Sequence, residues 1–147
     1  RPRVEAVRRG ASIDLVVRGA CVLPRGVPGF TENIRVRSIV GRFLEHSRIL
    51  YFRWGAGDED EVLYLSSADW MSRNIDGRIE VGTPIYDDRL KQRILDILEL
   101  QLSDTCKARV IDADQKNEYV KRGNRRKIRS QVAIYDYLKR IESNNGQ

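Results

Sequence analysis

Two short apolar runs separated by a turn-forming stretch constrain the fold more than any other feature of this sequence. Residues 47–52 and 61–66 are rich in aliphatic and aromatic side chains, and the stretch 55–60 between them holds two glycines and three acidic residues. Runs of this kind, joined by a turn that contains glycine and aspartate, are typical of an antiparallel β-hairpin. The sequence therefore predicts a hairpin near the middle of the chain.

Hydrophobic periodicity predicts further strands around the hairpin and helices toward the end of the chain. The run Ile13-Asp14-Leu15-Val16-Val17 favours a buried strand over 12–18, and a loop rich in proline and glycine should follow it from Leu23 to Asn33. Further strands are expected at 34–37, 77–85 and 108–111, and helices at 38–44, 88–102 (capped by Asp87 and Asp88) and around Ile128, Val132, Tyr135 and Leu138. This order predicts an α+β fold in which helices flank a mixed β-sheet.

Length and composition are those of one globular domain. With 147 residues, of which 41% are hydrophobic and 33% charged, the chain is expected to form a single domain over residues 1–147. No apolar run approaches the roughly 20 residues that a membrane helix needs. The N-terminus has neither an initiator methionine nor an apolar signal core, so we interpret the chain as a domain excised from a longer one. Cys21 and Cys106 lie far apart, which predicts neither a disulfide nor a zinc site and favours a reduced, cytoplasmic setting.

Positive charge is concentrated in one segment. The formal net charge is +6, and the stretch from Lys121 to Arg129, here called the basic segment, holds six basic residues and no acidic one. A concentrated positive field binds and steers polyanions, so we expect a phosphate-rich partner, with Arg125, Arg126 and Lys127 as candidate polyphosphate-binding residues. Gly123-Asn124 predicts a turn that presents backbone N–H groups just before a helix N-terminus, a geometry that favours an anion. The alternative is a solvated basic surface.

Three residues outside the basic segment could carry chemistry. His46 is the single histidine, and its imidazole could exchange a proton with a bound phosphate or donate a hydrogen bond to it. Arg48 follows two residues later, and Arg18 leaves the end of an apolar strand, where ligands often lie in open sheets. A structural histidine and an ion-paired arginine are the alternatives. The run from Ser66 to Trp70 either offers hydroxyl side chains to a ligand at the end of a strand or forms a turn in which serine and aspartate cap backbone groups.

Five segments of the chain together resemble one known family. They are Ile13-Asp14-Leu15-Val16-Val17-Arg18-Gly19, Gly26-Val27-Pro28-Gly29, Glu32 to Arg48, Tyr64-Leu65-Ser66-Ser67-Ala68-Asp69-Trp70-Met71, and Arg122-Gly123-Asn124-Arg125-Arg126-Lys127. These segments closely resemble the C-terminal catalytic part of polyphosphate kinase, and the resemblance runs from about Gly10 to Ile141.

The resemblance implies a fold and a set of roles. It implies a phospholipase D-like domain, the second of a duplicated pair, in which each half supplies one histidine to a shared tunnel. His46 would be the second-half histidine, and Arg18 and His46 would line the ATP phosphate site, with Arg48 as a further phosphate-binding candidate. ATP would be the substrate. The phosphorylated histidine and the Mg²⁺ ligands would lie in the first half, so that no metal ligand is expected here.

The resemblance also has implications for partners and for chemistry. It implies contacts with the remaining domains of the parent chain, with ATP and with polyphosphate. It further implies a homo-oligomeric, cytoplasmic and at most membrane-associated parent, with no nucleic-acid partner and no membrane span. The general phospholipase D signature His-x-Lys-x4-Asp is not kept, because Arg48 replaces the lysine and Arg53 the aspartate. Phosphoryl transfer is therefore favoured over lipase or nuclease chemistry.

Two alternatives to a kinase fragment remain at the level of the sequence. One is a phospholipase D-like nuclease with a single motif, which would complete its site by homodimerising so that two copies of His46 meet. The other is a non-catalytic module that binds polyanions through the basic segment.

Overall fold

The computed structural model describes residues 9–19, 21, 23, 27–29, 31–55, 57, 59–112, 114 and 116–145. These residues form two compact units, of which unit 1 contains the residues up to Glu45 and those from Ile97 on, and unit 2 contains His46–Asp96. Several predictions concern residues outside the described ranges: the N-terminal stretch 1–8, the loop residues 24–26, the turn residues 56 and 58, and the two C-terminal residues. That both units belong to one domain stays a prediction.

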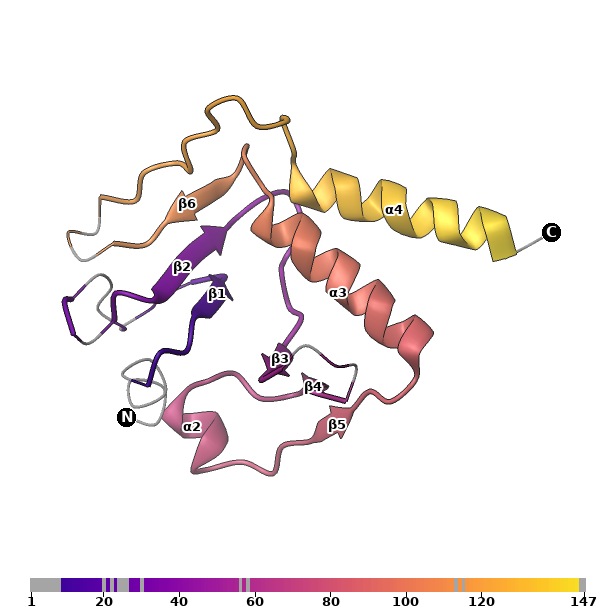
Figure 1. Cartoon of the computed structure of the whole chain (residues 1–147), viewed down its shortest axis with the longest axis horizontal. Helices are drawn as coiled ribbons and strands as arrows, with labels where there is room; N and C mark the ends of the chain where they lie inside the picture. The colour runs from indigo at the N-terminus through magenta and orange to yellow at the C-terminus, as the bar shows by residue number, and fades with distance from the viewer. Residues whose placement is uncertain are drawn as a thin grey trace. The chain divides into compact units, whose positions relative to one another are not determined.

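Unit 1 is built around a three-stranded mixed sheet in the order β1-β2-β6. The strands β1 (Ile13–Val17) and β2 (Ile34–Ile39) are parallel, whereas β6 (Ala108–Val110) pairs with β2 in the antiparallel direction. Figure 1 shows β2 between its two neighbours. The strands predicted at 12–18, 34–37 and 108–111 are thus confirmed, and β2 extends two residues further than expected.

The core of unit 1 lies on one face of the central strand. Ile34 and Val36 are fully buried, while Arg35 between them is exposed, which is the alternation that a strand with one covered face requires. The hydrophobic side chains that pack against this pair are Ile13, Leu15, Val17, Cys21, Leu23 and Ile111. β1 therefore ends at the edge of the core, and Arg18 is the first residue beyond it.

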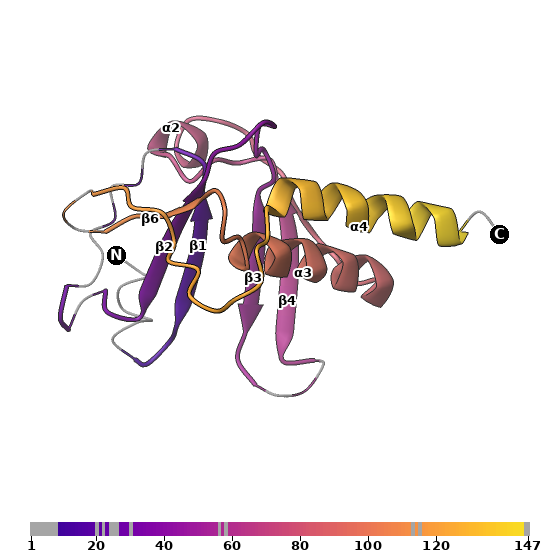
Figure 2. The ribbon, with the colours of Figure 1, turned by 90° about the horizontal axis from the view of Figure 1, so that it is seen from above.

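Unit 2 is an antiparallel three-stranded sheet in the order β3-β4-β5. β3 (Ile49–Arg53) and β4 (Glu61–Ser66) form the predicted hairpin, and they lie side by side in Figure 2. The strand expected at 77–85 is shorter: only β5 (Gly82–Pro84) pairs with β4. Pro84 lies on an edge strand, where the missing N–H removes no central ladder bond. A short helix, α2 (Ser72–Ile75), was not predicted.

Both long helices occur where they were expected. α3 (Asp88–Leu102) matches its predicted bounds, and the Asp87 carboxylate caps it by accepting the Leu90 N–H at 2.9 Å. Leu90, near the start of this helix, is exposed. α4 (Ser130–Asn145) begins two residues after Ile128, which was predicted to belong to this helix. The predicted apolar positions of α4 are all exposed: Val132, Tyr135 and Leu138.

Two expectations about the architecture are wrong. The α+β class is confirmed, but the strands form two separate three-stranded sheets, and only the sheet of unit 1 is mixed. The helix predicted at 38–44 does not form, because Ser38 and Ile39 end β2 and the following residues hydrogen-bond to side chains from elsewhere in the chain. Within the described ranges, no helix is both long enough and apolar enough to cross a membrane.

Candidate functional site

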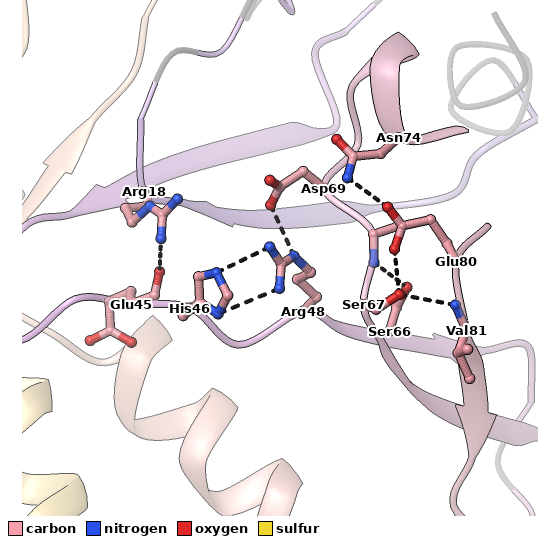
Figure 3. A network of polar contacts seen from close by, with 11 residues as sticks. Arg18, Glu45, His46, Arg48, Ser66, Ser67, Asp69, Asn74, Glu80 and Val81 are labelled. Atoms are coloured by element: carbon pink, nitrogen blue, oxygen red, sulfur yellow. Dashed lines mark hydrogen bonds and ion pairs between the residues drawn. The ribbon is translucent and has the colours of Figure 1, made fainter. Parts of the chain in front are cut away.

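Arg18 reaches the peptide group that precedes His46. Its Nη1 donates a hydrogen bond of 3.1 Å to the carbonyl oxygen of Glu45, and Figure 3 shows the guanidinium directed at that oxygen. The Glu45 carbonyl belongs to the peptide bond that joins Glu45 to His46. Arg18 is exposed and lies directly after β1, as predicted for a residue that emerges from the end of a buried strand.

The segment from Gly41 to Glu45 is held by side chains of two helices. The side-chain amide of Gln131, the second residue of α4, is only 8% exposed. It accepts the Phe43 N–H at 3.1 Å and donates to the Phe43 carbonyl at 2.7 Å and to Glu45 Oε1 at 2.8 Å. Gln101 of α3 donates to the other carboxylate oxygen, Oε2, at 3.1 Å. The backbone leading to His46 is therefore fixed within unit 1, and these bonds replace those of the predicted helix.

A cleft of about 290 Å³ opens beside Arg18 in unit 1. The Arg42 guanidinium lies 5.9 Å from the centre of the Phe43 ring, which is a cation–π distance. Arg18 and residues 39–45 line the cleft, so that two arginines accompany a largely apolar wall.

The structure brings His46 and Arg48 into contact in unit 2. Nη1 of Arg48 lies 3.5 Å from Nδ1 of His46, and Nη2 lies 3.2 Å from Nε2. The remaining guanidinium nitrogen, Nε, donates to Asp69 Oδ1 at 2.9 Å. His46 is exposed, whereas Arg48 and Asp69 are partly covered. Sequence reasoning named Asp69 only as a turn residue and missed this contact.

The run from Ser66 to Trp70 forms a turn in which the two serines cap backbone groups, which is one of the two structures that the sequence left open. Ser66 Oγ accepts the Ala68 N–H at 3.1 Å, and Ser67 Oγ accepts the Val81 N–H at 2.9 Å. Ser67 also donates to Glu80, and Figure 3 shows both serines beside that carboxylate. The run therefore joins β4 to the segment that precedes β5.

Glu80 is a second carboxylate that sequence reasoning missed. Asn74, which is almost completely buried, donates from Nδ2 to Glu80 Oε1 at 2.7 Å. The hydrogen bond from Ser67, the bond from Asn74 and the nearby charges of Arg78 and Arg48 hold the pKa of Glu80 below its usual range. In the sequence Glu80 lies between Ile79 and Val81, so no local pattern marks it as a site residue.

Trp54, Trp70 and Arg53 are exposed residues of unit 2. Arg53, which stands where the phospholipase D signature has an aspartate, donates from Nε to the Gly55 carbonyl at 3.0 Å.

The basic segment folds partly on itself. Gly123 has φ of +56° and forms the predicted turn with Asn124. Arg125 Nε donates to the Arg122 carbonyl at 3.1 Å, and Arg122 Nη1 donates to the Arg125 carbonyl at the same distance. Arg125 also donates to the carbonyl of Lys121. The residues from Lys121 to Lys127 are exposed, so their charge faces solvent.

The helix N-terminus that follows the basic segment already has an anion, contrary to the expectation of an open site. The buried Asp104 carboxylate accepts the backbone N–H of Ser130 at 2.7 Å and its hydroxyl at 2.8 Å. The other oxygen of Asp104 accepts three backbone N–H groups, those of Cys106, Lys107 and Ala108. Burial by itself would raise the pKa of Asp104, but the bonds from Lys107, Ser130 and Ala108 outweigh it and hold the pKa below normal.

No metal centre is built from the described residues, since they contain no group of three or more histidine, cysteine, aspartate or glutamate side chains that could hold an ion. The residues that the sequence singled out take part in three sets of polar contacts: Arg18 with the Glu45 carbonyl, His46 with Arg48 and Asp69, and the basic segment with its own carbonyls.

Comparisons with known proteins agree with this picture. A family model described as "Polyphosphate kinase C-terminal domain 2" matches residues 3–131, a range that includes Arg18, His46 and the whole basic segment. Polyphosphate kinases of Vibrio parahaemolyticus and Escherichia coli are each 56% identical, over 93% and 90% of this chain. The Yersinia pestis enzyme is 57% identical over 90%. The chain spans about 19% of the length of these relatives.

A solved structure matches as well. The crystal structure of polyphosphate kinase from Porphyromonas gingivalis superposes with a TM-score of 0.89 at 44% identity, and the match covers 96% of this chain and 21% of that one. Likeness in sequence and in structure therefore points to the same group of proteins, and the chain belongs to the polyphosphate kinase family.

Proposed function

We propose that this chain is part of an enzyme that reversibly transfers the terminal phosphate of ATP to polyphosphate, through a phosphohistidine that lies outside these residues. The observation that carries this proposal is the match of the polyphosphate kinase family over residues 3–131, which includes both Arg18 and His46. The named relatives favour this reading over a nuclease and over a purely polyanion-binding module. The same resemblance supports a phospholipase D-like fold and a homo-oligomeric, cytoplasmic parent.

Arg18 is proposed to bind ATP phosphate. A guanidinium carries five N–H donors in a fixed fork, and the bond to the Glu45 carbonyl uses one nitrogen of that fork. The guanidinium is thereby oriented while it stays exposed, and it can meet phosphate oxygens through its other edge. A positioned cation of this kind stabilises the loose, charge-rich transition state of phosphoryl transfer.

His46 is proposed to act on the same phosphates in a supporting role. In the first step a histidine elsewhere in the enzyme attacks the γ-phosphorus of ATP, and the bond to the β–γ bridging oxygen breaks to release ADP. In the second step a terminal oxygen of polyphosphate attacks that phosphorus and breaks the P–N bond. His46 can donate a hydrogen bond or a proton to a phosphate oxygen in these steps. Mg²⁺ held by other parts of the enzyme would neutralise phosphate charge.

The basic segment is proposed to contact polyphosphate. Its side chains from Lys121 to Lys127 are exposed, and the helix N-terminus beyond them is already occupied by Asp104, so the side chains rather than the helix would hold the polymer. Arg125 is oriented by bonds to loop carbonyls, and its neighbours Arg126 and Lys127 add charge at the same turn.

Substituting Arg18 and His46 tests the proposal. In a full-length polyphosphate kinase that contains this domain, Arg18→Ala and His46→Ala should each lower turnover about a hundredfold or more, because a positioned cation or proton donor is lost. Thermal melts should show that both variants stay folded. Folded variants with wild-type turnover would refute these two roles, whereas unstable variants with normal activity per folded molecule would assign both residues to structure.

A further inference from the structure

The ring of His46 is held from one side by a two-residue arrangement within unit 2. Arg48 contacts both ring nitrogens, at 3.5 and 3.2 Å, and its own Nε is bound to Asp69 at 2.9 Å. The Arg48 backbone is fixed as well, because its carbonyl accepts the Ser66 N–H at 2.8 Å beside the β3–β4 ladder. Figure 3 shows the Arg48 guanidinium in contact with Asp69 on one side and with the His46 ring on another.

The paired contacts indicate that the two terminal nitrogens of the guanidinium direct their N–H groups at the two nitrogens of the imidazole ring. Arginine donates and never accepts, and a neutral imidazole has only one acceptor nitrogen, so both contacts cannot be ordinary in-plane hydrogen bonds. The two terminal nitrogens of a guanidinium and the two nitrogens of an imidazole have similar separations, which lets one arginine reach both ring nitrogens at once. The ammonium of lysine is a point charge and has no such fork of donors.

We propose that Arg48 and Asp69 are positioning residues for His46: Asp69 orients the Arg48 guanidinium, and that guanidinium sets the plane of the imidazole. This inference rests on the proposed role of His46 in phosphoryl transfer. It gives Arg48 a different task from the phosphate-binding one that was expected from its charge and position in the sequence, because all three guanidinium nitrogens have partners within the protein. It gives a function to Asp69, to which the sequence assigned only a turn.

The partial exposure of the Arg48–Asp69 ion pair allows a role in positioning His46 to be tested separately from a role in stability. The side chains of Arg48 and Asp69 are 20% and 32% exposed, and ion pairs that water reaches contribute little to the free energy of unfolding. Loss of the pair should therefore leave the fold intact. A small rotation of the His46 ring would nevertheless move its nitrogens away from the reacting phosphate, and misplacement of a group by about 1 Å can cost a hundredfold in rate.

The test uses Arg48→Lys, Asp69→Ala and Asp69→Asn in a full-length polyphosphate kinase that contains this domain. Arg48→Lys and Asp69→Ala should each lower kcat about tenfold or more, with KM for ATP within about threefold of wild type, because an orienting contact is lost and a binding contact is not. Asp69→Asn, which keeps an acceptor oxygen, should lose less than Asp69→Ala. The double variant Arg48→Lys/Asp69→Ala should lose about as much as either single one, because the two residues act through one another.

A matched control comes from unit 1. Arg35 and Asp14 form an arginine–aspartate pair of the same chemistry, with Arg35 Nε and Nη2 bound to the two carboxylate oxygens at 2.7 and 2.6 Å. That pair is 58% and 31% exposed and links β1 to β2 away from His46 in the sequence. Arg35→Lys and Asp14→Ala should leave kcat unchanged. Thermal melts of every variant establish that the comparison is made between folded proteins.

Three outcomes would overturn the proposal. A raised KM for ATP at unchanged kcat in Arg48→Lys, with a normal Asp69→Ala variant, would show that Arg48 binds phosphate directly. Full kcat in folded Asp69→Ala would remove Asp69 from the arrangement. Additive losses in the double variant would show that the residues act independently. His46→Ala in the same assay separates the two levels: normal turnover there contradicts the proposed function, whereas an inactive His46→Ala beside a normal Asp69→Ala contradicts only the positioning.

Discussion

Gly41 is the position at which an added side chain would most disturb the segment that leads to His46. A Cβ at this position would lie 2.2 Å from Gln131 Oε1 and 2.7 Å from its Cδ, closer than real contacts allow. The glycine has an ordinary φ, so its role is close approach and not backbone freedom. Gln131 could move aside only by giving up its bonds to Phe43 and Glu45. The absence of a side chain at Gly41 and the position of the Gln131 side chain therefore depend on each other.

Gly41→Ala should destabilise the chain, and Gln131→Ala should partly reverse that loss. The single substitutions should each cost about 1–3 kcal/mol, from overpacking and from lost buried hydrogen bonds respectively. In the double variant the added methyl group enters the space vacated by glutamine, so the combined cost should fall short of the sum by about 1 kcal/mol. Urea unfolding of the four proteins measures this coupling.

Gly82→Ala provides the control for this cycle, because nothing lies within 4 Å of its added Cβ and its φ is also ordinary. It should leave the unfolding midpoint nearly unchanged. Strict additivity of Gly41→Ala and Gln131→Ala would contradict the packing argument.

Among the elements, α4 is tied to the rest of unit 1 through Asp104. This carboxylate is fully buried and accepts donors both from the start of α4 and from the turn that leads into β6. A negative charge at a helix N-terminus is favourable, and here the chain supplies it internally. The element that the basic segment leads into is thus anchored without any ligand.

Asp104→Asn should destabilise the chain by about 3 kcal/mol at neutral pH, because an amide places N–H groups against buried donors. The folded-state pKa of Asp104 is lowered, so its contribution is present above the unfolded pKa of about 3.9 and is lost as the pH falls through the folded-state value. The difference between wild type and variant should therefore shrink below about pH 4. Urea unfolding across pH measures it.

Asp114→Asn is the control for Asp104, because Asp114 is an exposed partner of Lys116. Its effect on the unfolding midpoint should be much smaller at every pH. An Asp104→Asn variant as stable as wild type at neutral pH would contradict the anchoring role.

Elements whose signals are local could be predicted, and those that depend on distant partners could not. The bounds of α3 follow from apolar periodicity and the Asp87 cap, and the β3–β4 hairpin follows from two runs and a turn. The stretch after β2 has helical composition, but its backbone bonds go to Gln131, 88 residues away from Phe43. The division into two sheets likewise depends on pairing between distant strands, which periodicity does not specify.

The candidate site shows the same division. His46 and Arg18 stand out because one is the single histidine and the other ends an apolar strand. The contact between Arg48 and Asp69 joins residues 21 positions apart, and it forms only because β4 pairs with β3 and places the turn after β4 near Arg48. A sequence pattern identifies residue types, whereas the register of strand pairing determines which side chains come into contact.

At the scale of the whole molecule, the chain has the means to hold a polyanion but only one histidine. Covalent phosphoryl transfer needs a nucleophile, and His46 is proposed here to support the transfer and not to be phosphorylated. The net charge of +6 equals the charge of the basic segment. The positive charge that would attract a polyanion therefore lies within this chain. This chain should therefore be able to bind polyphosphate but not to transfer phosphate.

The 147-residue chain should bind polyphosphate without transferring phosphate. Binding should weaken steeply as salt rises, because each neutralised phosphate releases counterions. Replacing Arg125, Arg126 and Lys127 with glutamine should weaken binding about tenfold or more and flatten the salt dependence, because three contacts are lost. Arg89, Lys139 and Arg140 are also exposed, and replacing these three with glutamine removes the same amount of charge. This control variant should weaken polyphosphate binding less. An equal effect of both triple variants would make the basic segment an ordinary solvated surface.

Incubation of the chain with γ-labelled ATP and Mg²⁺ should give neither polymer nor acid-labile label, because His46 is proposed to support the transfer and not to be phosphorylated. Label on His46 would show that it is itself the nucleophile.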